Sequence, residues 1–249
     1  MCGRITLATP AEDIADYFQL TDWLPLAPRY NIAPTQTVAV IRQNPLQNQR
    51  ELAMLRWGLI PKWAEDLSIG SRLINARSET VSQKPAFREA FKQRRCLVIA
   101  DGFYEWKRSA GKQAYWIHVK DSKLFAMAGL WERKDVANAE PIESFTVLTT
   151  EANELLAPLH DRMPVILAPE DYNVWLDPHT KPEALNALLK SYPAAAMEMT
   201  PVSSRVNDPK NEGAECLEPA VENPEIPAGA PASKPKRRKG EDPNQGMLF

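Results

Sequence analysis

The 249 residues are 44% hydrophobic and 25% charged, which excludes a wholly disordered protein and suits one large domain or two small ones. The 30 basic and 32 acidic side chains give a net charge of -2. This balance argues against a globally basic nucleic-acid binder but leaves a local basic groove open. No apolar run reaches the ~18–20 residues of a membrane helix, and the N-terminal stretch lacks a signal-peptide core. We therefore expect a soluble, cytoplasmic protein without membrane contact.

The predicted elements are short strands with helices interspersed rather than regularly alternating. Apolar residues at helical spacing indicate the helices, and alternating or continuous apolar runs indicate the strands. The first half of the chain is predicted to contain a helix at 10–20, strands at 37–42 and 51–57, a long loop at 58–72, a helix at 84–93 and a strand at 96–100. A hairpin of 103–107 and 114–119 around 109–112 follows, and then strands at 124–131 and 144–149. The last predicted elements are a helix at 151–159 capped by Thr150, a strand at 164–167, helices at 169–176 and 181–190, and a strand at 196–202. This order predicts an α+β fold on a curved, mainly antiparallel sheet.

The composition changes at the C-terminal end of the predicted domain, residues 2–218. Residues 221–249 hold five of the 22 prolines, the basic run 234–239 and few large apolar side chains. We therefore predict that 219–249 is a disordered, Pro-rich basic tail. Its last residues place Gln245, Leu248 and Phe249 in a pattern that resembles the short peptide by which bacterial proteins dock on a sliding clamp. Accidental composition is an equally open alternative.

Metal and cofactor signals are weak. Three cysteines, at positions 2, 96 and 216, make neither a disulfide framework nor a paired-cysteine zinc motif. The chain also lacks a glycine-rich phosphate loop. We predict no metal and no cofactor.

Cys2 directly follows the initiator methionine. Removal of Met1, which is usual before a small residue, would leave an α-amine of pKa ~7.7–8.0 beside a thiol of pKa near ~8.5. Such a terminus condenses with an aldehyde to a Schiff base that the thiol closes into a thiazolidine. It also has the groups to attack an amide, as N-terminal-nucleophile hydrolases do. A small apolar residue buried at the chain start is the alternative.

Three further polar residues stand among apolar neighbours: Asn75, Glu105 and His160. A carboxylate between aromatic residues in a strand is either desolvated, with a raised pKa, or exposed on the other face. A salt bridge to Lys107 is the simpler interpretation of Glu105, and a loop histidine with its hydrogen bonds satisfied is the simpler interpretation of His160. The sequence does not show that these residues meet.

Six motifs in fixed order resemble those of the SRAP (SOS response-associated peptidase) family of abasic-site processing proteins. They cover the chain from Cys2 to about Cys216 and are Met-Cys-Gly-Arg at the N-terminus, Arg29-Tyr-Asn-Ile-Ala-Pro34, Trp57-Gly-Leu, Ile74-Asn-Ala-Arg-Ser-Glu79, Asp101-Gly-Phe-Tyr-Glu-Trp106 and His160-Asp-Arg-Met-Pro164. The resemblance implies a single SRAP domain, a sheet or barrel with peripheral helices, that acts as a monomer on single-stranded DNA.

The resemblance also implies a covalent chemistry and assigns roles to four residues. Cys2 is the nucleophile that forms a thiazolidine crosslink with the ring-opened sugar of an abasic site. Asn75 positions the aldehyde and the terminal amine, and Glu105 assists Schiff-base formation. His160 acts as acid or base on the sugar hydroxyl and in reversal of the link. A carboxyl of raised pKa suits both directions of proton transfer.

The DNA contacts implied by the resemblance need only a local basic stripe. The residues carried over for DNA binding are Arg4, Pro34, Trp63, Arg77 and Thr149, with Pro34 and Trp63 as apolar or stacking elements. We add Arg72 and Arg205 from the sequence itself.

Two other functions remain open at this point. One is a thiol peptidase with Cys2 as nucleophile and His160 or Glu105 as base, which could release Met1 by its own action. The other is a non-catalytic adaptor between single-stranded DNA and a clamp.

Overall fold

The structure is a computed structural model that describes residues 2–44, 49–107 and 113–220. The predicted hairpin turn at 109–112, the tail from 221 onward and the proposed clamp contacts of Gln245, Leu248 and Phe249 lie outside the described residues.

Five strands close into a barrel, in the order β10-β4-β3-β6-β9 and back to β10. All of these pairings are antiparallel except β4 with β10. Every residue of β6 is buried, because the strand is covered on both faces, and this explains its continuous apolar run. The barrel strands are β3 (Thr37–Gln43), β4 (Arg50–Trp57), β6 (Arg95–Ala100), β9 (Phe125–Val136) and β10 (Ala139–Glu151).

Three short strands extend the barrel wall. The first, β5, runs parallel to β10, while β11 pairs with β10 and β12 with β9. Between β11 and β12, Val165 donates its N–H to Leu148 and accepts from Ala128, so this segment fills the gap where β9 and β10 separate. These strands are β5 (Asn75–Arg77), β11 (Arg162–Pro164) and β12 (Ile166–Leu167).

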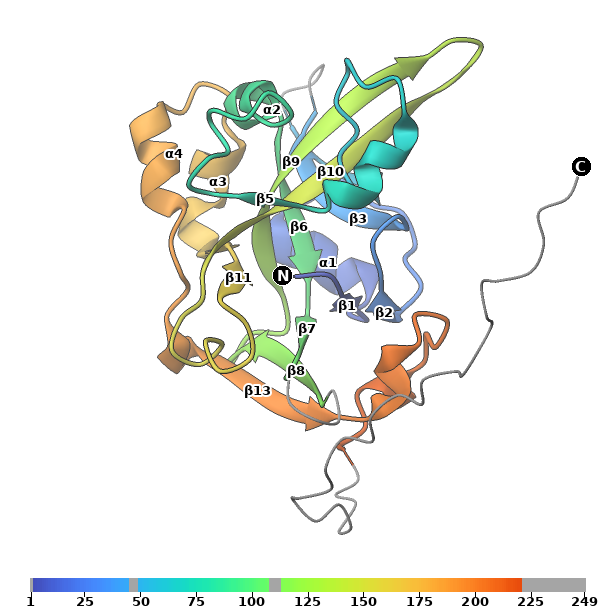
Figure 1. Cartoon of the computed structure of the whole chain (residues 1–249), viewed down its shortest axis with the longest axis vertical. Coiled ribbons are helices and arrows are strands. Elements are labelled where there is room, and N and C mark those ends of the chain that lie inside the picture. The colour runs from blue at the N-terminus through green and yellow to red at the C-terminus, as the bar shows by residue number, and fades with distance from the viewer. Residues whose placement is uncertain (1, 45–48, 108–112, 221–249) are drawn as a thin grey trace, which may run out of the picture.

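A second, antiparallel sheet has the order β13-β8-β7-β1-β2. In Figure 1, β1 lies next to β2, and β7 continues below β6 toward β8 and β13. One face of the sheet, with Ile5, Phe103 and Ile117, joins the main core, whereas Tyr104 on the other face packs with Val206. The strands are β1 (Ile5–Leu7), β2 (Arg29–Ile32), β7 (Gly102–Trp106), β8 (Ala114–Val119) and β13 (Met197–Val202).

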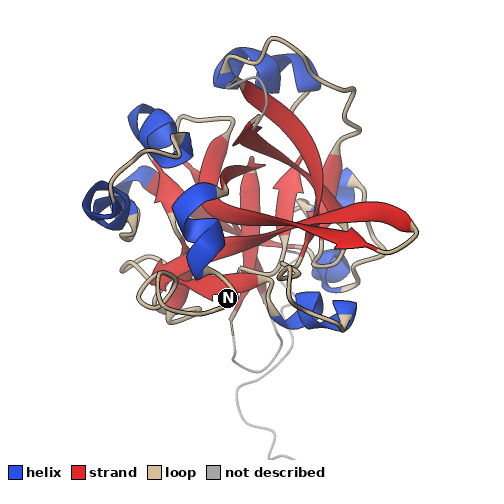
Figure 2. Ribbon diagram, turned by 90° about the horizontal axis from the view of Figure 1, so that it is seen from above, coloured by secondary structure: helices blue, strands red, loops and turns tan. Residues whose placement is uncertain are grey.

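The helices lie around the outside of the strands (Figure 2). They are α1 (Ala11–Phe18), α2 (Arg88–Gln93), α3 (Tyr172–Leu176) and α4 (Pro182–Leu188), with 3-10 turns η1 (Leu67–Arg72), η2 (Pro169–Asp171), η3 (Ala194–Ala196), η4 (Ser204–Asn207) and η5 (Ala214–Cys216). Among the described residues, no helix has the length and apolar character needed to cross a membrane. After β13 the chain returns beside it, since Ser203 N–H donates to the Glu218 carbonyl.

The architecture confirms the α+β class and the mainly antiparallel sheet. The predicted helix at 151–159, with its cap at Thr150, is wrong: Glu151 ends β10, Thr150 pairs with Met163, and the following residues form turns. Asn153 caps these turns instead, because its Oδ1 accepts from Leu156 N–H at 3.1 Å. Pro158 has no N–H to continue a helical ladder, so the turns do not lengthen into a helix.

Candidate active site

The segment that carries Cys2 is fixed to β7 by Asp101. The Asp101 carboxylate accepts hydrogen bonds from Thr6 Oγ1, from Ala8 N–H at 2.5 Å and from Thr9 N–H at 3.1 Å. The Trp116 indole N–H also donates to Thr6 Oγ1, at 3.2 Å. These bonds fix the register in which Ile5 faces Phe103 and the Tyr104 N–H donates to the Arg4 carbonyl.

A glycine makes this arrangement possible. A Cβ atom on Gly102 would lie 2.0 Å from Trp116 Nε1, far inside any allowed contact. Gly102 therefore lets the Trp116 indole lie against β7 and reach Thr6.

Cys2 is completely buried in the segment that precedes β1. Burial, and then the charge of the nearby Glu105 carboxylate, raises the pKa of the Cys2 thiol to about 12. Asn75, on β5, donates from Nδ2 to the Cys2 carbonyl at 2.8 Å. Asn75 Oδ1 is buried and has no hydrogen-bond partner within the described part of the chain. The structure thus brings Cys2, Asn75 and the 5%-exposed Glu105 together, from three elements distant in sequence.

His160 lies just before β11, at the end of the turns that follow β10. Two of the contacts of its ring are with its own loop: Nδ1 accepts the Arg162 N–H at 2.9 Å and lies 2.8 Å from Asp161 Oδ1. β5 carries Asn75, β11 follows the His160 loop, and both strands pair with β10. β10 therefore connects the His160 loop to Asn75. The role of His160 as acid or base stays a prediction.

An ion pair that the sequence did not reveal holds this region together. The Arg162 guanidinium binds Glu79 in a bidentate manner, at 2.6 and 2.9 Å, and Nη2 also donates to the Thr149 carbonyl. This hydrogen bond with Arg162 holds the pKa of Glu79 below its ordinary value. Both residues belong to the quoted motifs, but their pairing spans 83 positions, which no local pattern reveals.

The residues predicted to contact DNA occupy different environments. Trp63 is 60% exposed, Arg77 is exposed at the end of β5, and Pro34 is half-buried. Thr149 is 1% exposed and its hydroxyl donates to the Ala76 carbonyl at 3.4 Å, so in this conformation its side chain fastens β5. Arg72 and Arg205, named from the sequence alone, are exposed. The DNA contacts of all these residues stay predictions.

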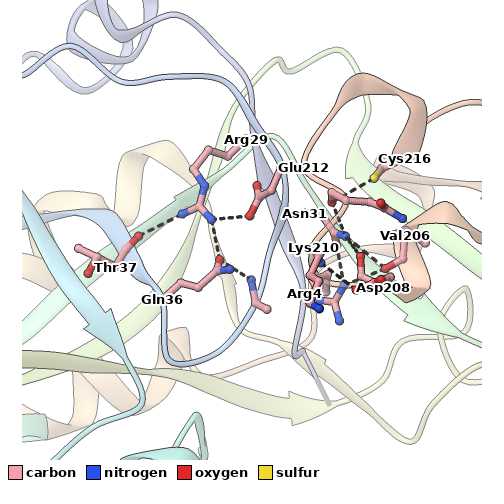
Figure 3. Close-up of polar contacts among 12 residues, drawn as sticks. Arg4, Arg29, Asn31, Gln36, Thr37, Val206, Asp208, Lys210, Glu212 and Cys216 are labelled. Atoms are coloured by element: carbon pink, nitrogen blue, oxygen red, sulfur yellow. Dashed lines mark hydrogen bonds and ion pairs between the residues drawn. The ribbon is translucent and has the colours of Figure 1, made fainter.

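Arg4 is half-buried in a polar network that includes an unpredicted residue, Asn31 (Figure 3). Arg4 Nη1 donates to Asn31 Oδ1 at 2.6 Å and to the Val206 carbonyl at 2.8 Å. The guanidinium also lies over the Trp106 ring, 5.6 Å from its centroid, and burial lowers its pKa. Asn31 belongs to the motif Arg29–Pro34, so the sequence contained a signal that could have identified it.

Metal binding has little support in the parts of the chain that the structure describes, where no three His, Cys, Asp or Glu side chains gather in a metal-holding group. The chemistry available at the site is that of a buried thiol, an amide and a carboxyl group.

Comparison with known proteins gives consistent relatives. A family model described as SOS response associated peptidase (SRAP) matches residues 1–209. Abasic site processing protein YoaM of Bacillus subtilis is 46% identical over 224 residues, which cover 88% of this chain and 98% of YoaM. YobE, an abasic site processing protein of the same organism, is 43% identical over 216 residues, covering 84% of this chain and 98% of YobE. A crystal structure of a Bacteroides thetaiotaomicron protein superposes with a TM-score of 0.77 at 27% identity, covering 88% of this chain and all of that one.

Proposed function

The chain belongs to the SRAP family, and we propose on this basis that it processes abasic sites in single-stranded DNA by forming a thiazolidine crosslink through Cys2. The observation that carries the proposal is the meeting of Cys2 with Asn75 and Glu105 at the start of the chain. The names of YoaM and YobE state abasic site processing for those relatives.

The proposed reaction begins when Met1 is removed and the α-amine of Cys2 becomes free. The neutral amine attacks the aldehyde carbon of the ring-opened sugar, and one proton moves from nitrogen to the former carbonyl oxygen. Loss of this hydroxyl together with the second amine proton gives a Schiff base and one water. The Cys2 sulfur then adds to the imine carbon while its proton passes to the imine nitrogen, which closes the five-membered ring.

The surrounding side chains suit these proton transfers. Asn75 holds the Cys2 carbonyl through Nδ2, so its buried Oδ1 is available to accept from the amine or from the intermediate hydroxyl. The Glu105 carboxyl protonates the leaving hydroxyl and takes the proton back in the reverse direction. His160 acts as acid or base on the sugar hydroxyl, in agreement with the role that the family resemblance assigns to it.

The raised pKa of Cys2 favours aldehyde chemistry over peptide cleavage. A thiol peptidase needs a thiolate nucleophile, which burial and a neighbouring carboxylate both oppose. In the proposed crosslinking, the amine attacks first and the thiol adds afterwards with its proton still to transfer. We therefore propose crosslinking, and not peptide cleavage, as the activity at Cys2.

DNA binding is proposed to come from a local surface rather than from net charge. The exposed Arg77 supplies a phosphate contact, and the exposed Trp63 offers a face on which a base stacks. The weak binding expected from a net charge of -2 is offset at a lesion by covalent capture.

The test is incubation with a single-stranded oligonucleotide that carries one abasic site, followed by denaturing electrophoresis. Wild type and Cys216→Ala should form a heat-stable adduct, because Cys216 lies in the second core cluster with Tyr104. Cys2→Ala should form none. A heat-stable adduct with Cys2→Ala, or none with wild type, would refute the proposed function.

A further inference from the structure

Asn31 joins three segments of the chain and is itself completely buried on β2. Its Nδ2 donates toward the carbonyls of Val206, Asp208 and Asn211, at 3.3, 3.0 and 2.8 Å. Its Oδ1 accepts from Arg4. Figure 3 shows Arg4 and Asn31 against the segment that carries Val206 and Asp208. A buried amide with partners on both its oxygen and its nitrogen fixes the side chains around it.

Arg4 is fixed on one side only. Its Nη1 is shared between Asn31 Oδ1 and the Val206 carbonyl, whereas its Nε is buried and has no hydrogen-bond partner in the described residues. The side chain as a whole is only half-buried, and a guanidinium binds phosphate well through its N–H groups. Arg4 also lies two residues after Cys2, in the segment that leads into β1, and its carbonyl accepts from the Tyr104 N–H.

We propose that Asn31 is a positioning residue for DNA: with the Val206 carbonyl, it holds Arg4 so that the exposed part of its guanidinium meets a phosphate of the strand whose abasic site reacts at Cys2. The proposal rests on the proposed function and adds to it a residue that does not touch DNA. It also gives the segment 203–211 a part in the site, although the chain folds it onto the far face of the second sheet from the main core.

Arg29 provides a matched control on the same strand. It also ties β2 to the C-terminal segment, through Nη2 to Glu212 at 2.8 Å, and it binds Gln36 and the Thr37 carbonyl. Among the described residues, none of its hydrogen bonds reaches Arg4. Arg29→Lys keeps the positive charge and loses the planar fork, so it loosens the same segment without releasing Arg4.

The test is the affinity for a single-stranded oligonucleotide with a tetrahydrofuran abasic analogue, which has no aldehyde and so reports binding alone. Asn31→Ala should weaken binding about tenfold and lower the salt slope by about 1, the effect of one lost phosphate contact. Arg29→Lys should leave the slope unchanged. The double variant Arg4→Ala with Asn31→Ala should bind no more weakly than Arg4→Ala, because Asn31 acts through Arg4. The proposal would be overturned if the losses of affinity caused by Arg4→Ala and Asn31→Ala were additive in the double variant. Equal losses of affinity with Asn31→Ala and Arg29→Lys would also overturn it.

A second measurement covers the case in which Asn31→Ala does not fold. Asn31→Asp keeps the side-chain shape but cannot donate to the three carbonyls, and nitrogen NMR of arginine side chains reports whether Arg4 is held. Separate, slowly exchanging Arg4 guanidinium signals are expected in wild type and Arg29→Lys, with altered signals in Asn31→Asp. Unchanged Arg4 signals in Asn31→Asp would refute the positioning role. If wild type binds the analogue but never crosslinks a true abasic site, the proposed function is wrong. The affinities of the single and double variants of Arg4 and Asn31 still decide the role of Asn31 in that case.

Discussion

Cys96 and Cys2 are both completely buried, yet they lie in regions of opposite chemistry. Cys96 belongs to β6 inside the closed barrel, where every residue of the strand is buried. Burial raises the pKa of the Cys96 thiol, and only the charge of Arg42 acts against this. Cys2 lies beside the second sheet, where Asn75 holds its carbonyl and the charge of Glu105 helps to raise the pKa of its thiol. Burial is common to both cysteines, so polar neighbours distinguish the one that we propose to be reactive.

The same contrast runs through the two sheets. The barrel strands also carry buried polar groups, but Arg95 donates to four backbone carbonyls and Ser144 accepts from the Ile60 N–H, so these groups support the fold. The strands β1, β2 and β7 of the second sheet carry buried polar groups, namely Thr6, Asn31 and Glu105, whose contacts define one geometry. This difference implies that barrel variants change stability first and that variants in the second sheet change reactivity first.

The largest effect is expected when each of the two cysteines, Cys2 and Cys96, is replaced by serine. Cys2→Ser keeps the terminal amine but lacks the thiol, so it should form only a Schiff base, which borohydride traps and heat destroys. Cys96→Ser should keep the full heat-stable adduct and lose stability by about 1–3 kcal/mol, because it buries a hydroxyl without a partner. Electrophoresis with and without borohydride measures the two kinds of adduct, and chemical denaturation measures the loss of stability. A heat-stable adduct from Cys2→Ser would contradict the proposed role of the Cys2 thiol.

The next prediction compares two tryptophans, one inside the barrel and one outside. Trp57 is completely buried, stacks on Phe145 and donates to the Ile74 carbonyl at 3.0 Å. Trp57→Ala should lower the free energy of unfolding by about 3–5 kcal/mol. Trp63→Ala should change it by less than about 0.5 kcal/mol, since the side chain is 60% exposed. It should instead weaken DNA binding by about 1–3 kcal/mol, and unchanged affinity would exclude Trp63 from the DNA surface.

Asp101 tests whether the register of β1 matters for reactivity. Asp101→Asn keeps the shape but turns one acceptor of the Ala8 and Thr9 N–H groups into a donor, so stability should fall by about 1–3 kcal/mol. The rate of crosslinking at saturating DNA should fall as well, because Cys2 loses its fixed place beside Glu105. Single-turnover kinetics under conditions where the variant is folded measure this. A normal rate would show that the other contacts of β1 are sufficient.

The smallest effect is expected at Glu79 and depends on pH. Its pKa lies below the ordinary 4.5 because of Arg162, so the ion pair stabilises the folded state above that pH. The advantage of wild type over Glu79→Gln should be below about 1 kcal/mol at neutral pH, since the side chain is 46% exposed. It should disappear as the pH falls through the lowered pKa. Denaturation at pH 7, 5 and 3 checks this, and a difference that grows in acid would contradict it.

The sequence predicted most long elements because their apolar spacing is local. It missed β1, β2 and β5, since strands of three or four residues are too short to show a period. It placed a helix at 151–159 on spacing alone, where Asn153 and Pro158 impose turns. The site residues came from motifs, but Asp101 and Asn31 act through contacts across 93 and 180 positions. Such contacts are set by topology, which a single sequence does not display.

The central claim is tested most directly by intact mass spectrometry of the protein after reaction with an abasic oligonucleotide, followed by peptide mapping. We predict a species equal to the chain without Met1 plus the oligonucleotide less one water, with the link on the peptide that begins at Cys2. A reacted chain that retains Met1, or a link at any other residue, would contradict it.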